Sequence, residues 1–371
     1  MRGFRIGKAF GIPIEVNASW LVIFGLILWS LSAVLFPATL PGQGDALYWL
    51  MGLGTTLAFF GSLLLHELSH SLVSRHFGLQ VRRIILFIFG GISEATEEMP
   101  SAKVEFWVGI AGPLMSVLLG VLSGGLSLLA AGIGNDPLTV VFQWLAIVNI
   151  ALAVFNMLPG FPLDGGRVLR AAAWQITGSH RRATRIATRG GQIIAGLLLA
   201  WAALRFVNGD FLGGVWVGFL GYLLFQAASS SYGDLVIKDA LSRVGVADLM
   251  SRNVTSLHPE MTVRDAVDST LSRHAFGGYP VADGHVHGIL QANDVKRVPA
   301  GEWPRLRVTE LMKPLDDTEV LSPQTPVSEA LERFNRLGVG RLPVIQDGEL
   351  VGILSQSDVL RWLEWHPEAA K

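Results

Sequence analysis

The chain has 371 residues, of which 50% are hydrophobic and 16% are charged, and its formal net charge at pH 7 is −1. Soluble domains usually carry about 25% charged residues, so this composition indicates a membrane protein with several spans. The near-neutral charge argues against a nucleic-acid partner, and a chain without cysteine has neither disulfides nor thiolate metal sites.

Six uncharged runs predict transmembrane helices before residue 233. They are residues 18–36, 46–65, 106–134, 137–163, 191–204 and 211–233. A helix needs about 20 apolar residues to cross a bilayer, so the fifth run is short and requires Arg205 at the interface.

The basic residues indicate how these spans are oriented. Lys and Arg precede the first run, follow the second and separate the fourth from the fifth. The connections at residues 42–45, 135–136 and 208–210 hold Asp and no Lys or Arg. The positive-inside rule therefore predicts a multi-pass protein of the cell (plasma or inner) membrane with both termini in the cytoplasm.

The second run ends in the sequence His-Glu-x-x-His. His66 and His70 are four residues apart, so in a helix they share one face and both imidazoles reach one ion. Glu67 is placed to contact a metal-bound water instead of the metal. Ionisable groups inside a bilayer cost roughly 2.5–3.5 kcal/mol on insertion scales, which favours a bound cation over a purely structural role.

A short β-prone run follows at residues 84–89. Gly90 and Gly91 close it, and three glutamates come soon after. This pattern predicts a strand or hairpin within residues 80–98 that dips to the membrane surface. Open backbone at that depth is tolerated only against protein or water.

The fourth run is interrupted before it meets Asp164. Pro159, Gly160 and Pro162 unwind a helix there, which can turn the Asp164 carboxylate toward the core as a third metal ligand. Asn156 would supply partners for some of the freed backbone. Alternatively, Asp164 caps the following helix, residues 165–176. The spacing alone does not separate these two interpretations.

These motifs, in this order, carry a family resemblance. Residues 66–70 on one hydrophobic helix and 156–165 on a later one resemble the site-2 protease family of intramembrane zinc metalloproteases, over roughly residues 1–230. Residues 111–113 (Ala-Gly-Pro) are similar to the family's Gly-Pro motif, although Ser116 stands where the family often has Asn.

The resemblance implies one catalytic Zn²⁺ ion and a role for each motif residue. The zinc ligands would be His66, His70 and Asp164. Glu67 would be the general base and acid, and Asn156 would orient the substrate or stabilise the oxyanion. An unwound substrate would add to a strand edge formed by Ile88, Phe89, Gly90 and Gly91.

The last third of the chain repeats itself with a period of about 62–64 residues. Leu249-Met250 recurs as Leu311-Met312, and residues 288–295 recur as 352–359. Short strands and amphipathic helices alternate in each unit, which predicts an α/β fold. We therefore expect a transmembrane domain at 1–233, a linker at 234–245 and a soluble domain at 246–371.

The repeats, at about 246–300 and 308–364, resemble tandem cystathionine-β-synthase (CBS) domains. The resemblance implies a cytosolic pair that binds an adenine nucleotide such as ATP or AMP and can form a homodimer. Ser355 would reach phosphate, Asp358 would hold ribose hydroxyls, and Asp294 is a further nucleotide-binding candidate, in the first repeat. Gln291 replaces the family's Ser or Thr in the first repeat. Alternatively, the pair serves only for dimerisation or docking.

Together these features predict a polytopic α-helical membrane protein of about six spans, with a short β segment and a CBS pair. The predicted function is regulated intramembrane proteolysis by a zinc endopeptidase, modulated by adenine nucleotide. Its substrate would be a single-span or membrane-associated protein, such as an anti-sigma or pro-sigma factor. The alternatives are a CBS-regulated transporter or channel, for which a second broken helix is missing, and an inactive scaffold, against which intact Glu67 argues.

Overall fold

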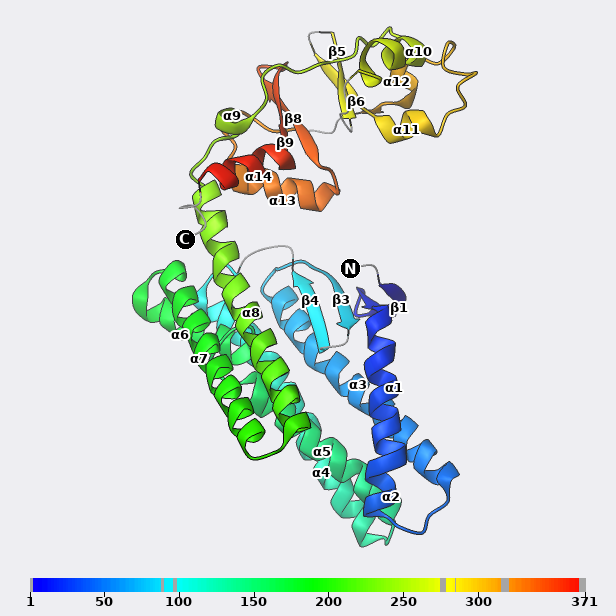
Figure 1. Ribbon diagram of the computed structural model, residues 1–371, viewed down its shortest axis with the longest axis vertical. Helices are drawn as coiled ribbons and strands as arrows, with labels where there is room; N and C mark the ends of the chain where they lie inside the picture. The colour runs from blue at the N-terminus through cyan, green and yellow to red at the C-terminus, as the bar shows by residue number, and fades with distance from the viewer. Residues whose placement is uncertain are drawn as a thin grey trace. The chain divides into compact units, whose positions relative to one another are not determined.

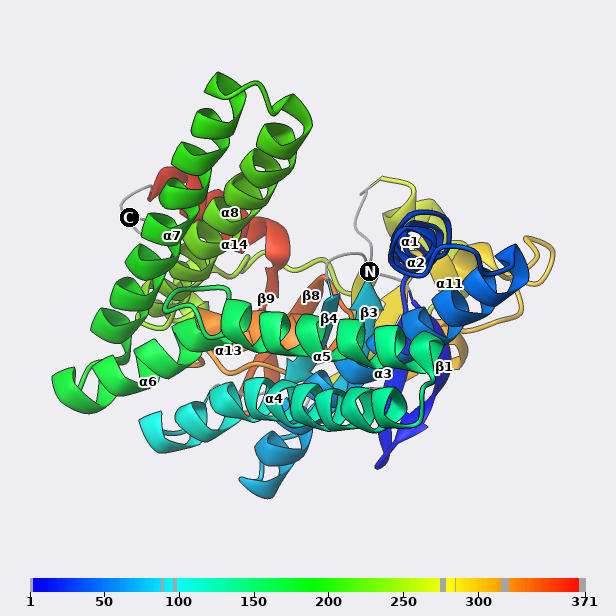
Figure 2. The ribbon, with the colours of Figure 1, turned by 90° about the horizontal axis from the view of Figure 1, so that it is seen from below.

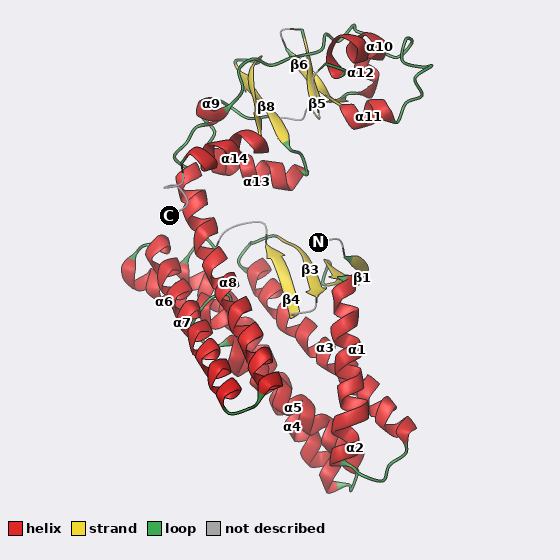
Figure 3. Ribbon diagram, viewed as in Figure 1, coloured by secondary structure: helices red, strands yellow, loops and turns green. Residues whose placement is uncertain are grey.

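The computed structural model describes residues 3–87, 90–95, 99–273, 278–283, 285–314 and 320–366. The chain forms two compact units, Met1–Tyr232 and Gly233–Lys371. Within the described residues, six helices are long and apolar enough to cross a membrane, as the sequence predicts. The first unit is helical with one small sheet, and the second is α/β (Figures 1 and 3).

The spans of the first unit follow the predicted runs and differ from them at several of their ends. They are α1–α2 (Ala18–Thr39, which includes a π-helical turn), α3 (Asp45–His76), α4 (Ala102–Gly132), α5 (Asp136–Asn156), α7 (His180–Val207) and the first part of α8 (Phe211–Leu241). The fourth span stops at Asn156 instead of residue 163, because two prolines and a glycine follow. The fifth span is not short, because α7 already begins at His180.

A four-stranded sheet lies against one end of these helices (Figure 3). Its strands are β1 (Phe4–Ala9), β2 (Ile12–Val16), β3 (Val81–Phe87) and β4 (Gly90–Ala95), in that order. β3 and β4 pair antiparallel as the predicted hairpin, whereas the pairing of β2 with β3 was not predicted. Ile12 and Ile84 are buried against Leu68 of α3, so this apolar contact anchors the sheet on α3.

The broken segment after α5 is held by glycine. It leads into the short helix α6 (Asp164–Thr177), while α4 and α5 run side by side (Figure 2). A Cβ atom at Gly160, Gly165, Gly166 or Gly190 would overlap the backbone of a neighbouring segment. These glycines therefore let the segment pack backbone to backbone between α6 and α7.

The second unit contains two similar halves. The first holds α9 (Val246–Leu249), α10 (Val263–Ala266), β5 (Gly278–Ala282), β6 (Val286–Gln291) and α11 (Ala292–Lys296). The second holds α12 (Val308–Leu311), β7 (Lys313–Pro314), α13 (Val327–Leu337), β8 (Arg341–Gln346), β9 (Glu349–Ser355) and α14 (Gln356–Trp365). β5, β6 and β7 form one sheet, and β8 and β9 form another.

The repeated Met and Gly positions lock the two halves together. Met312 packs against Gly288, and Met250 packs against Gly352, each across to the other repeat. A Cβ atom at either glycine would come within 3.0 Å of the methionine sulfur. The repeated residues therefore belong to one reciprocal contact that the pair makes twice.

Candidate metal centre

Three atoms that could bind a metal ion converge between α3 and α6. The Nε2 atom of His66 lies 3.1 Å from Oδ2 of Asp164, and the Nε2 atom of His70 lies 3.2 Å from that oxygen. The two Nε2 atoms are 3.2 Å apart, and both histidines are less than 5% exposed. Leu163 occupies the N-cap position of α6 without a side-chain hydrogen bond, so the carboxylate of Asp164 points to the histidines instead of capping the helix.

This donor set fits a divalent metal such as zinc. Tetrahedral zinc with ligands at about 2.0–2.1 Å places its ligand atoms roughly 3.3 Å from one another, close to the observed spacing. Nδ1 of His70 donates to the Val108 carbonyl at 2.6 Å, which leaves an acceptor lone pair on Nε2. In neutral His70 that lone pair faces a carboxylate oxygen 3.2 Å away, an arrangement that a metal cation between them would relieve, as a proton on Nε2 would also do.

The Asp164 carboxyl is held in its ionised form. Burial by itself would raise its pKa, but the hydrogen bonds with His66 and His70 outweigh this and hold the pKa well below its usual range. An ionised carboxylate beside two imidazoles is what a metal site of this type requires.

One face of α4 supports the ligands from behind. The Val108 carbonyl accepts a hydrogen bond from His70, and the Ser116 hydroxyl lies 2.9 Å from Nδ1 of His66. A Cβ atom at Gly112 would overlap the Nε2 atoms of both imidazoles. The glycine of the Gly-Pro motif is therefore explained by close packing, and Ser116, noted in the sequence only as a departure, is a direct neighbour of His66.

A cavity of about 390 Å³ opens beside the three ligands. Glu67 and Asn156 both line it. Gly91 of β4 also lines it and packs so closely on Glu67 that a Cβ atom would overlap the carboxylate arm. Arg167 lines the cavity as well, which the sequence reasoning missed; its place three residues after Asp164 on α6 was the available signal.

The predicted strand edge is described only in part. Gly90 and Gly91 line the cavity, whereas Ile88 and Phe89 lie outside the described residues. Ser93 of the same strand forms a hydrogen bond of 2.9 Å with Ser71 of α3. β4 is therefore fixed to the helix that carries the histidines.

Comparison with known proteins gives the family. The model for peptidase family M50 matches residues 54–134 and 124–199, and the CBS domain model matches 246–301 and 308–364. Rip3 of Mycobacterium tuberculosis (strain ATCC 25618 / H37Rv), by name a candidate zinc metalloprotease, is 34% identical over 97% of this chain and 92% of its own length. The chain belongs to peptidase family M50.

Other similar proteins have matching names. The protein sll0528 of Synechocystis, also named as a candidate zinc metalloprotease, is 33% identical over 97% of this M50 chain and 95% of its own length. The zinc metalloprotease MJ0392 of Methanocaldococcus jannaschii is 27% identical over 96% and 95%. A solved site-2 protease from the same archaeon is 25% identical, with a TM-score of 0.42, and covers 62% of this chain and 95% of its own.

Because the chain belongs to M50, it is a membrane metalloprotease that carries a CBS pair. The transporter, channel and scaffold alternatives are therefore set aside. The zinc dependence of the family agrees with the donor set described above. Within the described residues, the triad on α3 and α6 is the one cluster of three or more His, Asp or Glu ligands close enough to share an ion.

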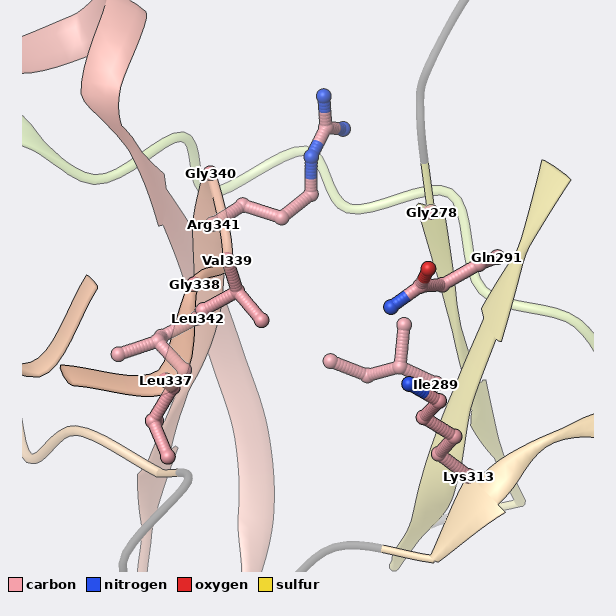
Figure 4. Close-up of a pocket in the computed structure, with 10 residues that line it drawn as sticks. All are labelled: Gly278, Ile289, Gln291, Lys313, Leu337, Gly338, Val339, Gly340, Arg341 and Leu342. Carbon is pink, nitrogen blue, oxygen red and sulfur yellow. The ribbon is translucent and has the colours of Figure 1, made fainter. Parts of the chain in front are cut away.

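The CBS pair of this M50 protease contains a partly open cavity of about 300 Å³. Figure 4 shows Ile289, Gln291 and Lys313 of the first sheet facing Val339 and Arg341 of the second half. The predicted nucleotide residues lie elsewhere: among the described residues that line this cavity are none of Asp294, Ser355 and Asp358. The Ser355 hydroxyl instead donates a hydrogen bond of 2.6 Å to the Asp358 carboxylate, as part of a capping box at the start of α14.

Proposed function

We propose that this protein is an intramembrane zinc endopeptidase whose ion is held by His66, His70 and Asp164. The observation that carries the proposal is the convergence of their three ligand atoms within 3.2 Å of one another in a buried site. When bound, zinc polarises the scissile carbonyl and lowers the pKa of a bound water from 15.7 to about 7.

The chain's own residues would then manage the proton and the carbonyl oxygen. Glu67 would accept a proton from the attacking water and deliver it to the leaving amine, which its position in the ligand cavity supports. Asn156 ends α5 at the same cavity, where its side-chain amide would donate to the carbonyl oxygen.

We propose that the substrate is a single-span membrane protein that unwinds and pairs with β4. β4 is the last strand in the sheet order and, within the described residues, pairs only with β3. Gly90, Gly91 and Ser93 of this strand line the cavity beside Glu67. An extended segment added to this edge would satisfy its amides while its scissile bond approaches the ligands.

Both termini are proposed to be cytoplasmic, from the distribution of Lys and Arg. The chain has no cysteine, so single cysteines placed at Gln43, Asn208 and Lys371 report exposure without background. An impermeant thiol reagent added to intact cells is expected to label the first two positions and not the third. Labelling of residue 371 would reverse the orientation.

We further propose that the CBS cavity binds an adenine nucleotide. Lys313 and Arg341 supply positive charge for phosphate, and Ile289 and Val339 supply an apolar surface for the base. Ser355 and Asp358 are less available for this role, because they cap α14. Calorimetric titration of the purified protein with ATP and with AMP tests the proposal, and no binding of either would contradict it.

The metal proposal is tested on the purified full-length protein. Elemental analysis is expected to find about one zinc per chain, and a chelator is expected to remove both the zinc and the cleavage of a single-span substrate. Added zinc should restore both. Cleavage that continues in metal-free protein would overturn the proposal.

A further inference from the structure

A buried ion pair joins α4 to α6 outside the ligand set. Glu105 is fully buried. Its Oε1 atom accepts a hydrogen bond from Nε of Arg170 and forms an ion pair with Nη2 of the same side chain, which is 17% exposed. The other oxygen, Oε2, has no hydrogen-bond partner among the described residues. A buried carboxylate oxygen without a hydrogen bond costs free energy, so a contribution to stability does not by itself explain this ion pair.

The pair reaches the segment that carries Asp164. The guanidinium carbon of Arg170 lies 4.8 Å above the ring of Phe161, which is itself buried. The backbone N–H of Phe161 donates to the carbonyl of Ala187 at 3.1 Å. Phe161 precedes Asp164 by three residues and Arg170 follows it by six, so Arg170 ties together the two ends of the turn that presents the carboxylate.

Glu105 also belongs to the face of α4 that supports the histidines. It lies one turn before Val108, whose carbonyl accepts a hydrogen bond from His70, and two turns before Gly112, which packs on both imidazoles. The same helix face thus contacts the histidines and, through Arg170, the turn that carries Asp164.

We propose that Glu105 and Arg170 are positioning residues that hold Asp164 within reach of His66 and His70 and so set the affinity of the metal centre. This inference rests on the proposed zinc site. A buried pair of this kind can be replaced by apolar residues of similar volume with little loss of stability, so positioning and stability can be separated by experiment.

The main variant is the double substitution Glu105→Leu with Arg170→Met. We expect a melting temperature close to that of the parent protein, and a zinc affinity about 10- to 100-fold weaker in competition with a chelator. The matched control removes the exposed Arg205–Asp210 pair by Arg205→Met with Asp210→Asn, and its zinc affinity should not change.

A second variant tests the inference if the double variant does not fold. Arg170→Lys keeps the charge but loses the planar, two-donor contact and the stacking on Phe161. Its zinc affinity should fall by less than that of the double variant and by more than that of the control. Parental zinc affinity in the double variant, or in Arg170→Lys when the double variant does not fold, would overturn the inference.

These outcomes separate the inference from the proposed function. If the parent protein binds no zinc, the metal proposal itself fails. If the parent protein binds zinc and cleaves its substrate while the variants match it, only the positioning role fails.

Discussion

The metal centre and the CBS cavity are built in different ways. In the first unit, each imidazole has one nitrogen at the ligand cluster and the other against α4, through Val108 or Ser116. In the second unit, the cavity forms where the two halves meet, and its charged side chains, Lys313 and Arg341, are long and not fully buried. One site is largely buried, and the other is partly exposed to solvent.

The surroundings explain this difference. A polar group buried in an apolar environment without a partner costs about 1–3 kcal/mol or more, so the residues of the membrane site must satisfy one another. Around the CBS cavity the long charged side chains are partly exposed, so a ligand there competes with solvent. Substitutions should therefore have large effects in the first site and small, salt-dependent effects in the second.

The largest effect is expected for Glu67→Gln. The amide keeps the shape but cannot accept the proton, so cleavage should fall by roughly 10²- to 10⁴-fold. Zinc content should stay at the parental level, because Glu67 is not one of the three clustered ligands. Assay of a single-span substrate with parallel elemental analysis measures both, and near-parental cleavage would exclude Glu67 as the base.

Gly112→Ala should affect the metal directly. The new methyl group would overlap both Nε2 atoms, so zinc affinity should fall by about 100-fold, the upper end of the range for changes around a metal. Gly125→Ala lies in the same helix with nothing within 4 Å and serves as the control. Equal zinc affinity in the two variants would show that the ligand cluster is not where the structure places it.

Ser116→Ala should have a smaller effect of the same kind. It removes the hydroxyl beside Nδ1 of His66, which leaves that buried nitrogen without its partner. Zinc affinity should fall by about 10-fold, the lower end of the range for residues around a metal. Competition with a chelator measures it, and Ser116→Asn, which keeps a polar partner, should lose less. A loss in Ser116→Asn as large as in Ser116→Ala would count against this role.

The smallest effect is expected in the CBS cavity. Lys313→Ala should weaken ATP binding by roughly 2- to 5-fold, because an exposed charge contributes about 0.2–1 kcal/mol. The loss should shrink as salt is raised. Lys296→Ala, an exposed lysine outside the cavity, is the control. A loss as large in Lys296→Ala, measured by calorimetry, would place the nucleotide elsewhere.

Much of this organisation could be read from local patterns. Uncharged runs predicted the six spans, since the length of an apolar run is compared directly with the bilayer thickness. The hairpin of β3 and β4 was also predicted, but its pairing with β2 was not. That pairing joins residues 70 positions apart, such as Ile14 and Ile84, and no local pattern specifies it.

The sequence alone determined that two imidazoles share one helix face, because a four-residue spacing fixes that geometry within a single turn. It left Asp164 undecided between a helix cap and a metal ligand. Only the tertiary structure places the Asp164 carboxylate beside both imidazoles, and it revealed Ser116, Arg167 and the Glu105–Arg170 pair, because these contacts depend on how α4 and α6 pack against α3. Contacts between distant segments arise from the packing of the whole unit, and no short stretch of sequence encodes them.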